Sequence, residues 1–148
     1  ANGANHNSPG TYSAVSWNVS FNFDAGNIIS VNVGDSTLID IANGDATKKR
    51  FYILTKVTTD KSSGGVRSST NIRILKDGAE IELVDGGTLA YGYNRLTDRG
   101  IDTIVSDAIV EVSSSTTSHI SVQGRTYRVD NFIINKATIS IIELIVST

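Results

Sequence analysis

The sequence predicts a mainly β fold of the α+β class. We expect an antiparallel sheet with an N-terminal hairpin, one amphipathic helix near residues 98–112, and further strands toward the C-terminus. Three observations support this prediction. Apolar and polar residues alternate strictly over several segments, as in strands with one buried face. Turn-forming sequences rich in Asp, Asn and Gly separate those segments. The chain has 148 residues and 39% hydrophobic content, which fits one domain with its own core.

The N-terminal part predicts an arm followed by a hairpin. Residues 1–10 are mostly Asn, Gly and Ser, so we expect a flexible arm before a single domain at 11–148. Apolar residues occupy every second position of 15–23, which predicts a half-buried strand. The turn chemistry of 24–27 and the apolar pattern of 28–33 then predict a return strand.

The middle of the chain predicts a run of strands. Each candidate is short, alternating or rich in β-branched residues, and bounded by Asp, Asn, Ser or Gly. A meander, in which each strand pairs with the next, is the simplest topology for them. The candidate strands span 38–41, 50–60, 71–76, 79–84 and 88–95.

The pattern changes at Thr97, a suitable helix N-cap, with Asp98 in the first turn. After it, apolar residues recur three or four positions apart, which predicts one amphipathic helix over 98–112. The residues that make this pattern are Ile101, Ile104, Val105, Ala108, Ile109 and Val112.

The last third predicts a return to strands. Residues 113–118 form a polar linker, and alternation resumes around 120–122 and 127–129. The run 138–146 favours a strand, with a helix as the alternative.

Nothing in the sequence indicates catalysis. The chain has no cysteine, which excludes thiolate chemistry, disulfides and cysteine zinc sites. His6 and His119 have no partner at metal-ligand or triad spacing, and the carboxylates occur mainly in turns. We therefore expect no enzymatic activity, no cofactor and no metal. The most hydrophobic segment, 139–146, is interrupted by Ser140 and Glu143, so we also expect no membrane partner.

The clearest functional signal is an uneven charge distribution. Residues 46–76 contain eight of the thirteen basic side chains and, as the only acid, Asp60. Basic groups neutralise phosphates and tyrosines stack on unpaired bases, which is how a sheet binds single-stranded RNA. The alternative is a solvated face with no partner. The candidate RNA-binding residues are Arg50, Lys56, Thr58, Arg73, Tyr91, Tyr93 and Arg95.

The order of elements over about 15–112 resembles the coat proteins of single-stranded RNA bacteriophages, the leviviruses. The segments "RFYILTKVTTD", "TNIRILK" and "LAYGYNRLTDRGIDTIVSDAIVEV" carry the resemblance. It implies a dimer with a continuous sheet, helices that cover the outer face, and an inner face against RNA. The function it implies is a self-assembling capsid subunit of a virion put together in the host cytoplasm. The RNA-facing residues by this resemblance would be Lys56, Thr58, Arg73, Tyr91, Tyr93 and Arg95.

Two other functional classes remain open. The alternating "AVSWNVSFNF" strand behind a polar arm also resembles subunits of fimbriae at the cell surface. There the arm would complete the sheet of a neighbouring subunit by donor-strand exchange. The other class is a carbohydrate-binding or virion-decorating β-sandwich, which the composition alone supports. In the capsid and fimbrial hypotheses, the main partners are copies of the chain itself.

Overall fold

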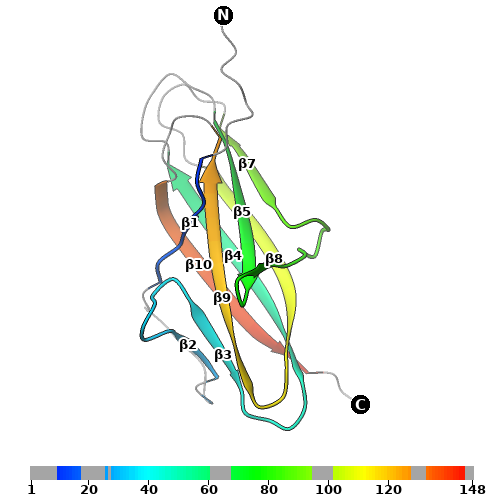
Figure 1. The fold of residues 1–148 in the computed structure, drawn as a ribbon. Helices are drawn as coiled ribbons and strands as arrows, with labels where there is room; N and C mark the ends of the chain where they lie inside the picture. The colour runs from blue at the N-terminus through cyan, green and yellow to red at the C-terminus, as the bar shows by residue number, and fades with distance from the viewer. Residues whose placement is uncertain are drawn as a thin grey trace, which may run out of the picture.

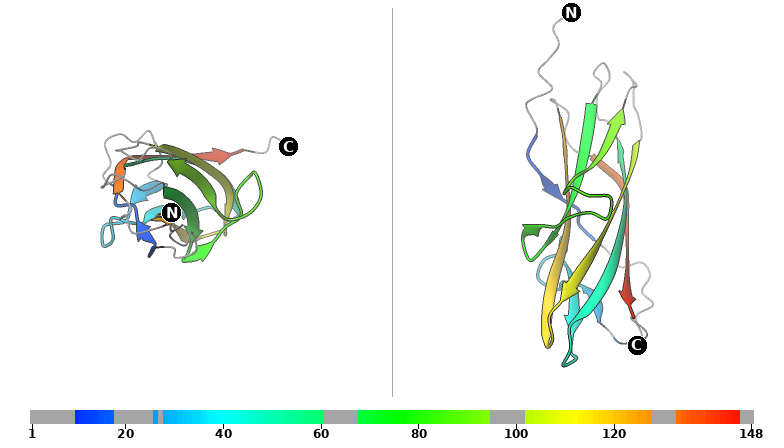
Figure 2. Two further views of the ribbon diagram at one scale, coloured as in Figure 1. Left: turned by 90° about the horizontal axis from the view of Figure 1, so that it is seen from above. Right: turned by 90° about the vertical axis from the view of Figure 1, so that its right-hand side faces the viewer.

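The chain folds as a sandwich of two antiparallel β-sheets. The structure is a computed structural model. Its layers pack face to face, with strands running along the long axis of the molecule (Figures 1 and 2). The predicted mainly β, antiparallel character is therefore confirmed. The structure describes residues 10–17, 26, 28–60, 68–94, 102–127 and 133–145.

Within the described residues the larger sheet has seven strands, with β5 and β9 at its centre. Its order is β2-β3-β9-β5-β6, with β1 also paired to β9 and β7 also paired to β5. The smaller sheet has three strands in the order β10-β4-β8. The strands of the larger sheet are β1 (Ser13–Ala14), β2 (Ile29–Val31), β3 (Ile39–Asn43), β5 (Ser68–Lys76), β6 (Ala79–Glu80), β7 (Ala90–Asn94) and β9 (Thr116–Thr126). Those of the smaller sheet are β4 (Lys49–Asp60), β8 (Asp102–Val112) and β10 (Ile133–Leu144).

The hydrophobic core lies between the two sheets. Side chains alternate between the two faces of a strand, so every second residue of the long strands points inward. Transfer of these apolar side chains out of water is the main favourable term of folding. Fully buried members include Phe51, Ile53 and Val57 from β4, Ile72 and Ile74 from β5, and Ile120 and Val122 from β9.

The predicted meander is wrong, because consecutive strands cross between the sheets. β4 pairs with β8 and β10, whereas the next strand, β5, pairs with β6, β7 and β9. β8 and β9 also lie in different sheets and are joined by the tight turn 113–115, where Ser115 has a φ of 55°. The apolar face of a strand is buried by the sheet that packs against it. A strand can therefore bury this face in either sheet, and it need not pair with its neighbour in sequence.

The predicted helix is also wrong where the structure describes it, since 102–112 is strand β8. Its inward residues alternate strictly and include Ile104, Ala108 and Val112. Its outward face carries two more apolar residues, Val105 and Ile109. Together the two sets imitate the three- and four-residue spacing of a helix. Residues 95–101, which include the start of the predicted helix, lie outside the described residues. Among the described residues, no helix is long and apolar enough to span a membrane.

The other predictions differ from the structure mainly at strand ends. β5 begins before the predicted start at 71, and β6 covers only the first two residues of the predicted strand 79–84. The final run is a strand, β10, rather than the alternative helix. The arm at 1–9 and most of the predicted strand 15–23 lie outside the described residues.

The Asp77-Gly78 turn forms as its sequence predicts. Lys76 pairs with Ala79, which leaves a two-residue loop between β5 and β6. Both loop residues have positive φ, 52° for Asp77 and 82° for Gly78. This is the conformation that a two-residue hairpin turn of type I′ requires, and Asp-Gly adopts it at low cost.

Candidate functional site

The candidate RNA-binding residues are divided between two opposite faces of the sandwich. Arg50, Lys56 and Thr58 lie on the outward face of β4, in the smaller sheet. The other described candidates, Arg73, Tyr91 and Tyr93, lie on the outward face of the larger sheet. Arg95 lies outside the described residues. The core separates the two groups, so they form two separate surfaces.

The second group belongs to a larger cluster, which we call the tyrosine–arginine face. β5 and β7 place Tyr91 directly opposite Asn71, and β5 and β9 place Arg125 opposite the same Asn71. The segment before β1 adds Tyr12, whose ring lies 3.6 Å from the Arg73 guanidinium carbon. The members of this face are Tyr12, Arg73, Tyr91, Tyr93, Arg125 and Tyr127.

Hydrogen bonds and stacking hold the centre of this face in place. Tyr12 also stacks on Arg125 at 4.3 Å, and burial raises the pKa of Tyr12 although both arginines lower it. Asn71 is fully buried; its amide nitrogen donates to the Tyr127 hydroxyl at 3.0 Å, and its oxygen accepts from Arg125 Nε at 3.3 Å. Arg125 Nη2 lies 3.2 Å from the same hydroxyl. These side chains therefore need little reordering to meet a ligand.

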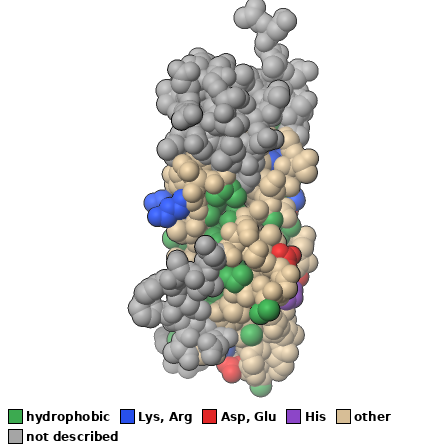
Figure 3. All heavy atoms as spheres, turned by 90° about the vertical axis from the view of Figure 1, so that its left-hand side faces the viewer, with side chains coloured by type: hydrophobic (Ala, Val, Ile, Leu, Met, Phe, Trp, Pro, Cys, Tyr) green, Lys and Arg blue, Asp and Glu red, His purple; other side chains and the backbone are tan. Residues whose placement is uncertain are grey.

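Carboxylates from other strands offset part of the basic charge around the two faces. Glu111 on β8 pairs with Lys48 Nζ at 3.0 Å and with Arg50 Nε at 3.4 Å. Arg73 pairs with Glu80 of β6. On the side of the molecule that Figure 3 shows, the described Lys and Arg side chains are separate and form no continuous basic area. On this side of the molecule the charge asymmetry along the chain therefore does not become a broad positive surface among the described residues.

The ion pair between Arg73 and Glu80 predicts a measurable acid dependence of stability. The hydrogen bond from Arg73 lowers the pKa of Glu80 below its ordinary value of 4.5. A carboxyl with a lowered folded pKa stabilises the fold above the unfolded pKa and loses that contribution as the pH falls through the folded value. Because both groups are partly exposed, we expect the contribution to be below about 1 kcal/mol.

The measurement is the urea midpoint of unfolding from pH 7 down to acid for the wild type and Glu80→Gln. The variant should lose stability less steeply below the ordinary pKa of 4.5. Glu82→Gln is the control, because Glu82 is exposed and has no ion pair among the described residues. Equal slopes for the wild type and Glu80→Gln would contradict the prediction.

The outward face of the smaller sheet carries an apolar patch. Ile142, Tyr52 and Ile109 lie directly across β10, β4 and β8, with Ile142 57% and Ile109 53% exposed. Tyr52 donates to Asp107 Oδ2 at 2.7 Å, and this hydrogen bond raises the pKa of Tyr52. Exposed apolar groups in such a cluster are typical of interaction surfaces. The apolar patch comprises Tyr52, Leu54, Val105, Ile109, Ile142 and Leu144.

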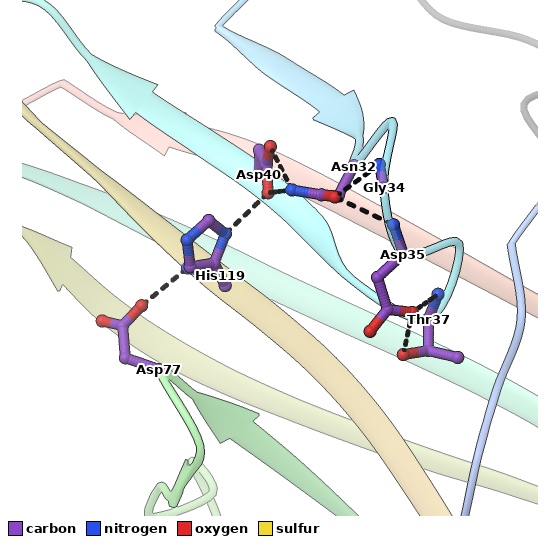
Figure 4. A network of polar contacts seen from close by, with 7 residues as sticks. All are labelled: Asn32, Gly34, Asp35, Thr37, Asp40, Asp77 and His119. Atoms are coloured by element: carbon purple, nitrogen blue, oxygen red, sulfur yellow. Dashed lines mark hydrogen bonds and ion pairs between the residues drawn. The ribbon is translucent and has the colours of Figure 1, made fainter.

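The His119 network shown in Figure 4 is a set of hydrogen bonds that connects separate segments of the larger sheet. His119 Nδ1 lies 2.7 Å from Asp40 Oδ1, and the Asn32 amide nitrogen donates to both Asp40 oxygens at 3.0 and 3.2 Å. The backbone nitrogen of His119 donates to Asp77 Oδ1 at 2.7 Å. The network links β3, β9 and the β5–β6 turn. Within the described ranges, no group of three or more His, Cys, Asp or Glu side chains could hold a metal ion.

No protein-family model matches the sequence, and no curated protein matches it. The two surfaces therefore have to be interpreted from their own chemistry.

Sequence reasoning found half of the tyrosine–arginine face and missed the apolar patch. Tyr12, Arg125 and Tyr127 were missed because they reach the face from segments remote in sequence from β5 and β7. The apolar patch had a signal, since Val105 and Ile109 are the residues that made β8 resemble a helix. A strand that is apolar on both faces is typical of one buried on both sides.

Proposed function

We propose that this chain is a structural, non-catalytic subunit that assembles with copies of itself through the apolar patch of the β10-β4-β8 sheet. The observation that carries the proposal is the row of Ile142, Tyr52 and Ile109 across all three strands. Above and below this row, Leu144, Leu54 and Val105 extend the same surface. The inner face of the same sheet is already buried against the core, so the outer face can be covered only by another molecule or another segment.

The surroundings of the patch fit an interface with a polar rim. Arg50 and Glu111 lie in the end row with Leu144, and Lys56 lies beside Val105 at the other end. Asp107 is a charged group inside the patch, opposite Leu54. Stable interfaces commonly have an apolar centre and a polar rim, with tyrosine among the side chains that contribute most to binding. A half-exposed isoleucine gains about 1 kcal/mol or more when the rest of its surface is covered.

A second copy is the partner that best fits this surface. Every copy of the chain carries this patch, so two copies can bring the same surface together. Homo-oligomers with closed symmetry are the commonest assemblies of folded chains. The carboxylate inside the patch, that of Asp107 opposite Leu54, accepts a hydrogen bond from the Tyr52 hydroxyl, so it keeps a partner when a second copy covers the patch. This supports self-assembly over binding of a polyanion at the centre of this face, because its basic residues lie at the ends: Arg50, paired with Glu111, at one end, and Lys56 and Lys136 at the other.

The experiment measures the oligomeric state by sedimentation velocity over a range of micromolar concentrations. We expect the wild type to self-associate, and Ile109→Lys or Ile142→Lys to weaken the association by at least about 100-fold, because a lysine without a partner is costly to bury. Val33→Lys is the matched control, since Val33 is fully exposed in the β2–β3 turn and outside the patch. Thermal unfolding should be similar in all three lysine variants.

A wild type that stays monomeric over the whole range would contradict the proposal. So would patch variants that associate as strongly as Val33→Lys. Electron microscopy of the assembled wild type then tests the narrower hypotheses. Closed shells that contain RNA are expected for a coat subunit of a virion, and filaments are expected for a fimbrial subunit.

A further inference from the structure

The tyrosine–arginine face has a chemistry that self-assembly through the opposite sheet leaves unexplained. Four of the chain's five tyrosines, all except Tyr52, belong to it. In Figure 1 its strands β5, β7 and β9 lie side by side in the larger sheet, whereas β10 and β4 belong to the other sheet. This concentration of tyrosine on one face is the observation to be explained.

Two of these tyrosines form an exposed platform. Tyr91 and Tyr93 are 67% and 47% exposed and occupy alternate positions of β7, so they point to the same side about 7 Å apart. An aromatic face is electron-rich and packs against weakly positive C–H groups. The C–H face of a sugar ring offers this complement, and consecutive rings can lie on consecutive tyrosines.

One arginine of this face, Arg125, forms no ion pair among the described residues. Arg73 is paired with Glu80, and it also donates to Gln123 Oε1 from Nε at 3.0 Å. Among the described residues Arg125 donates to the neutral groups Asn71 and Tyr127, and its Nη1 has no hydrogen-bond partner there. The hydrogen bond from Arg73 lowers the pKa of Glu80 and the charge of Arg125 contributes, but the carboxylate of Glu80 is paired with Arg73. An arginine held in this way binds a carboxylate with charge-assisted hydrogen bonds.

We propose that the tyrosine–arginine face binds an oligosaccharide that carries a single acidic sugar. Neutral sugar rings pack on Tyr91 and Tyr93, and the sugar carboxylate binds Arg125. A single-stranded RNA is a poorer fit, because each nucleotide brings a phosphate and such sites combine aromatic platforms with several free cations. The inference is independent of the assembly proposed above, since the two surfaces lie on opposite sheets.

The test is a titration of the full chain, followed by NMR chemical shifts and saturation transfer. The acidic probes are 3′-sialyllactose and cellobiouronic acid at millimolar concentrations, and lactose and cellobiose are their neutral counterparts. We expect at least one of the two acidic probes to bind, with an affinity at least about tenfold higher than that of its neutral counterpart. A tenfold difference in affinity is the equivalent of one charge-assisted hydrogen bond.

Three variants locate the site. Arg125→Gln should weaken binding of the acidic probe about tenfold, whereas Arg125→Lys, which keeps the charge, should retain part of it. Tyr91→Ser should remove most binding without unfolding the protein, because Tyr91 is exposed. Lys56→Gln makes the same charge change on the opposite sheet and should have no effect.

Three results would overturn the proposal. The first is no binding of either acidic probe by the folded wild type. The second is an equal loss of binding in Lys56→Gln and Arg125→Gln, which would indicate nonspecific charge attraction. The third is tighter binding of poly(U) than of the acidic oligosaccharides with the same dependence on Tyr91 and Arg125, which would assign the face to RNA.

Discussion

Replacement of Phe51 by alanine is expected to destabilise the fold by about 4 kcal/mol, the largest effect predicted for a single side chain of this protein. Phe51 is 1% exposed near the start of β4, where it faces the larger sheet. Its removal loses the transfer free energy of the ring and leaves a cavity that close-packed neighbours fill only in part.

Urea unfolding followed by the fluorescence of Trp17, the single tryptophan, measures this loss. The comparison belongs in the Ile109→Lys background, so that self-association does not add to the apparent stability. Ile142→Ala is the matched control on the outward face, 57% exposed, and is expected to cost less than about 0.5 kcal/mol. Similar losses for the two variants would contradict the assignment of inner and outer faces.

Replacement of Asn43 by aspartate is expected to cost about 3 kcal/mol. Asn43 is 2% exposed at the end of β3, and its amide nitrogen lies within hydrogen-bonding distance of three backbone carbonyls, those of Thr47, Val112 and Ser113. It thereby ties the β3–β4 loop to the β8–β9 turn. Aspartate has the same shape but no donor, and it places a negative charge against these carbonyl oxygens.

The same urea titration at neutral pH measures this effect. Asn135→Asp is the control, because Asn135 is exposed on β10 and the charge change is identical. We expect the control to change the midpoint by only a few tenths of a kcal/mol. A loss below about 1 kcal/mol for Asn43→Asp would contradict a structural role for these hydrogen bonds.

Much of the fold is predictable from local pattern. The alternation over 50–60 gave β4 almost to its ends, and Asp77-Gly78 gave the turn between β5 and β6, because both depend on residues a few positions apart. The pairing of strands is not local. Nothing near β4 in sequence indicates that its neighbours are β8 and β10, and this is why the meander was wrong.

The candidate sites show the same division. Tyr91 and Tyr93 could be found from the alternation of β7, whereas Tyr12 and Arg125 are joined to them only by the pairing of β9. Residues 46–76 are basic in sequence, but the sequence does not show how much of this charge is offset on the folded surface. Glu80 and Glu111 lie on other strands and pair with Arg73 and Arg50.

The sequence by itself determined that this protein is mainly β and that its turns lie where Asp, Asn and Gly gather. These properties follow from backbone conformations that single residues favour. Only the tertiary structure decided which face of β8 meets the core and which carries Val105 and Ile109 to the surface. That choice depends on the sheet that packs against the strand, since an apolar side chain looks the same in sequence whether its partner is the core or a second molecule.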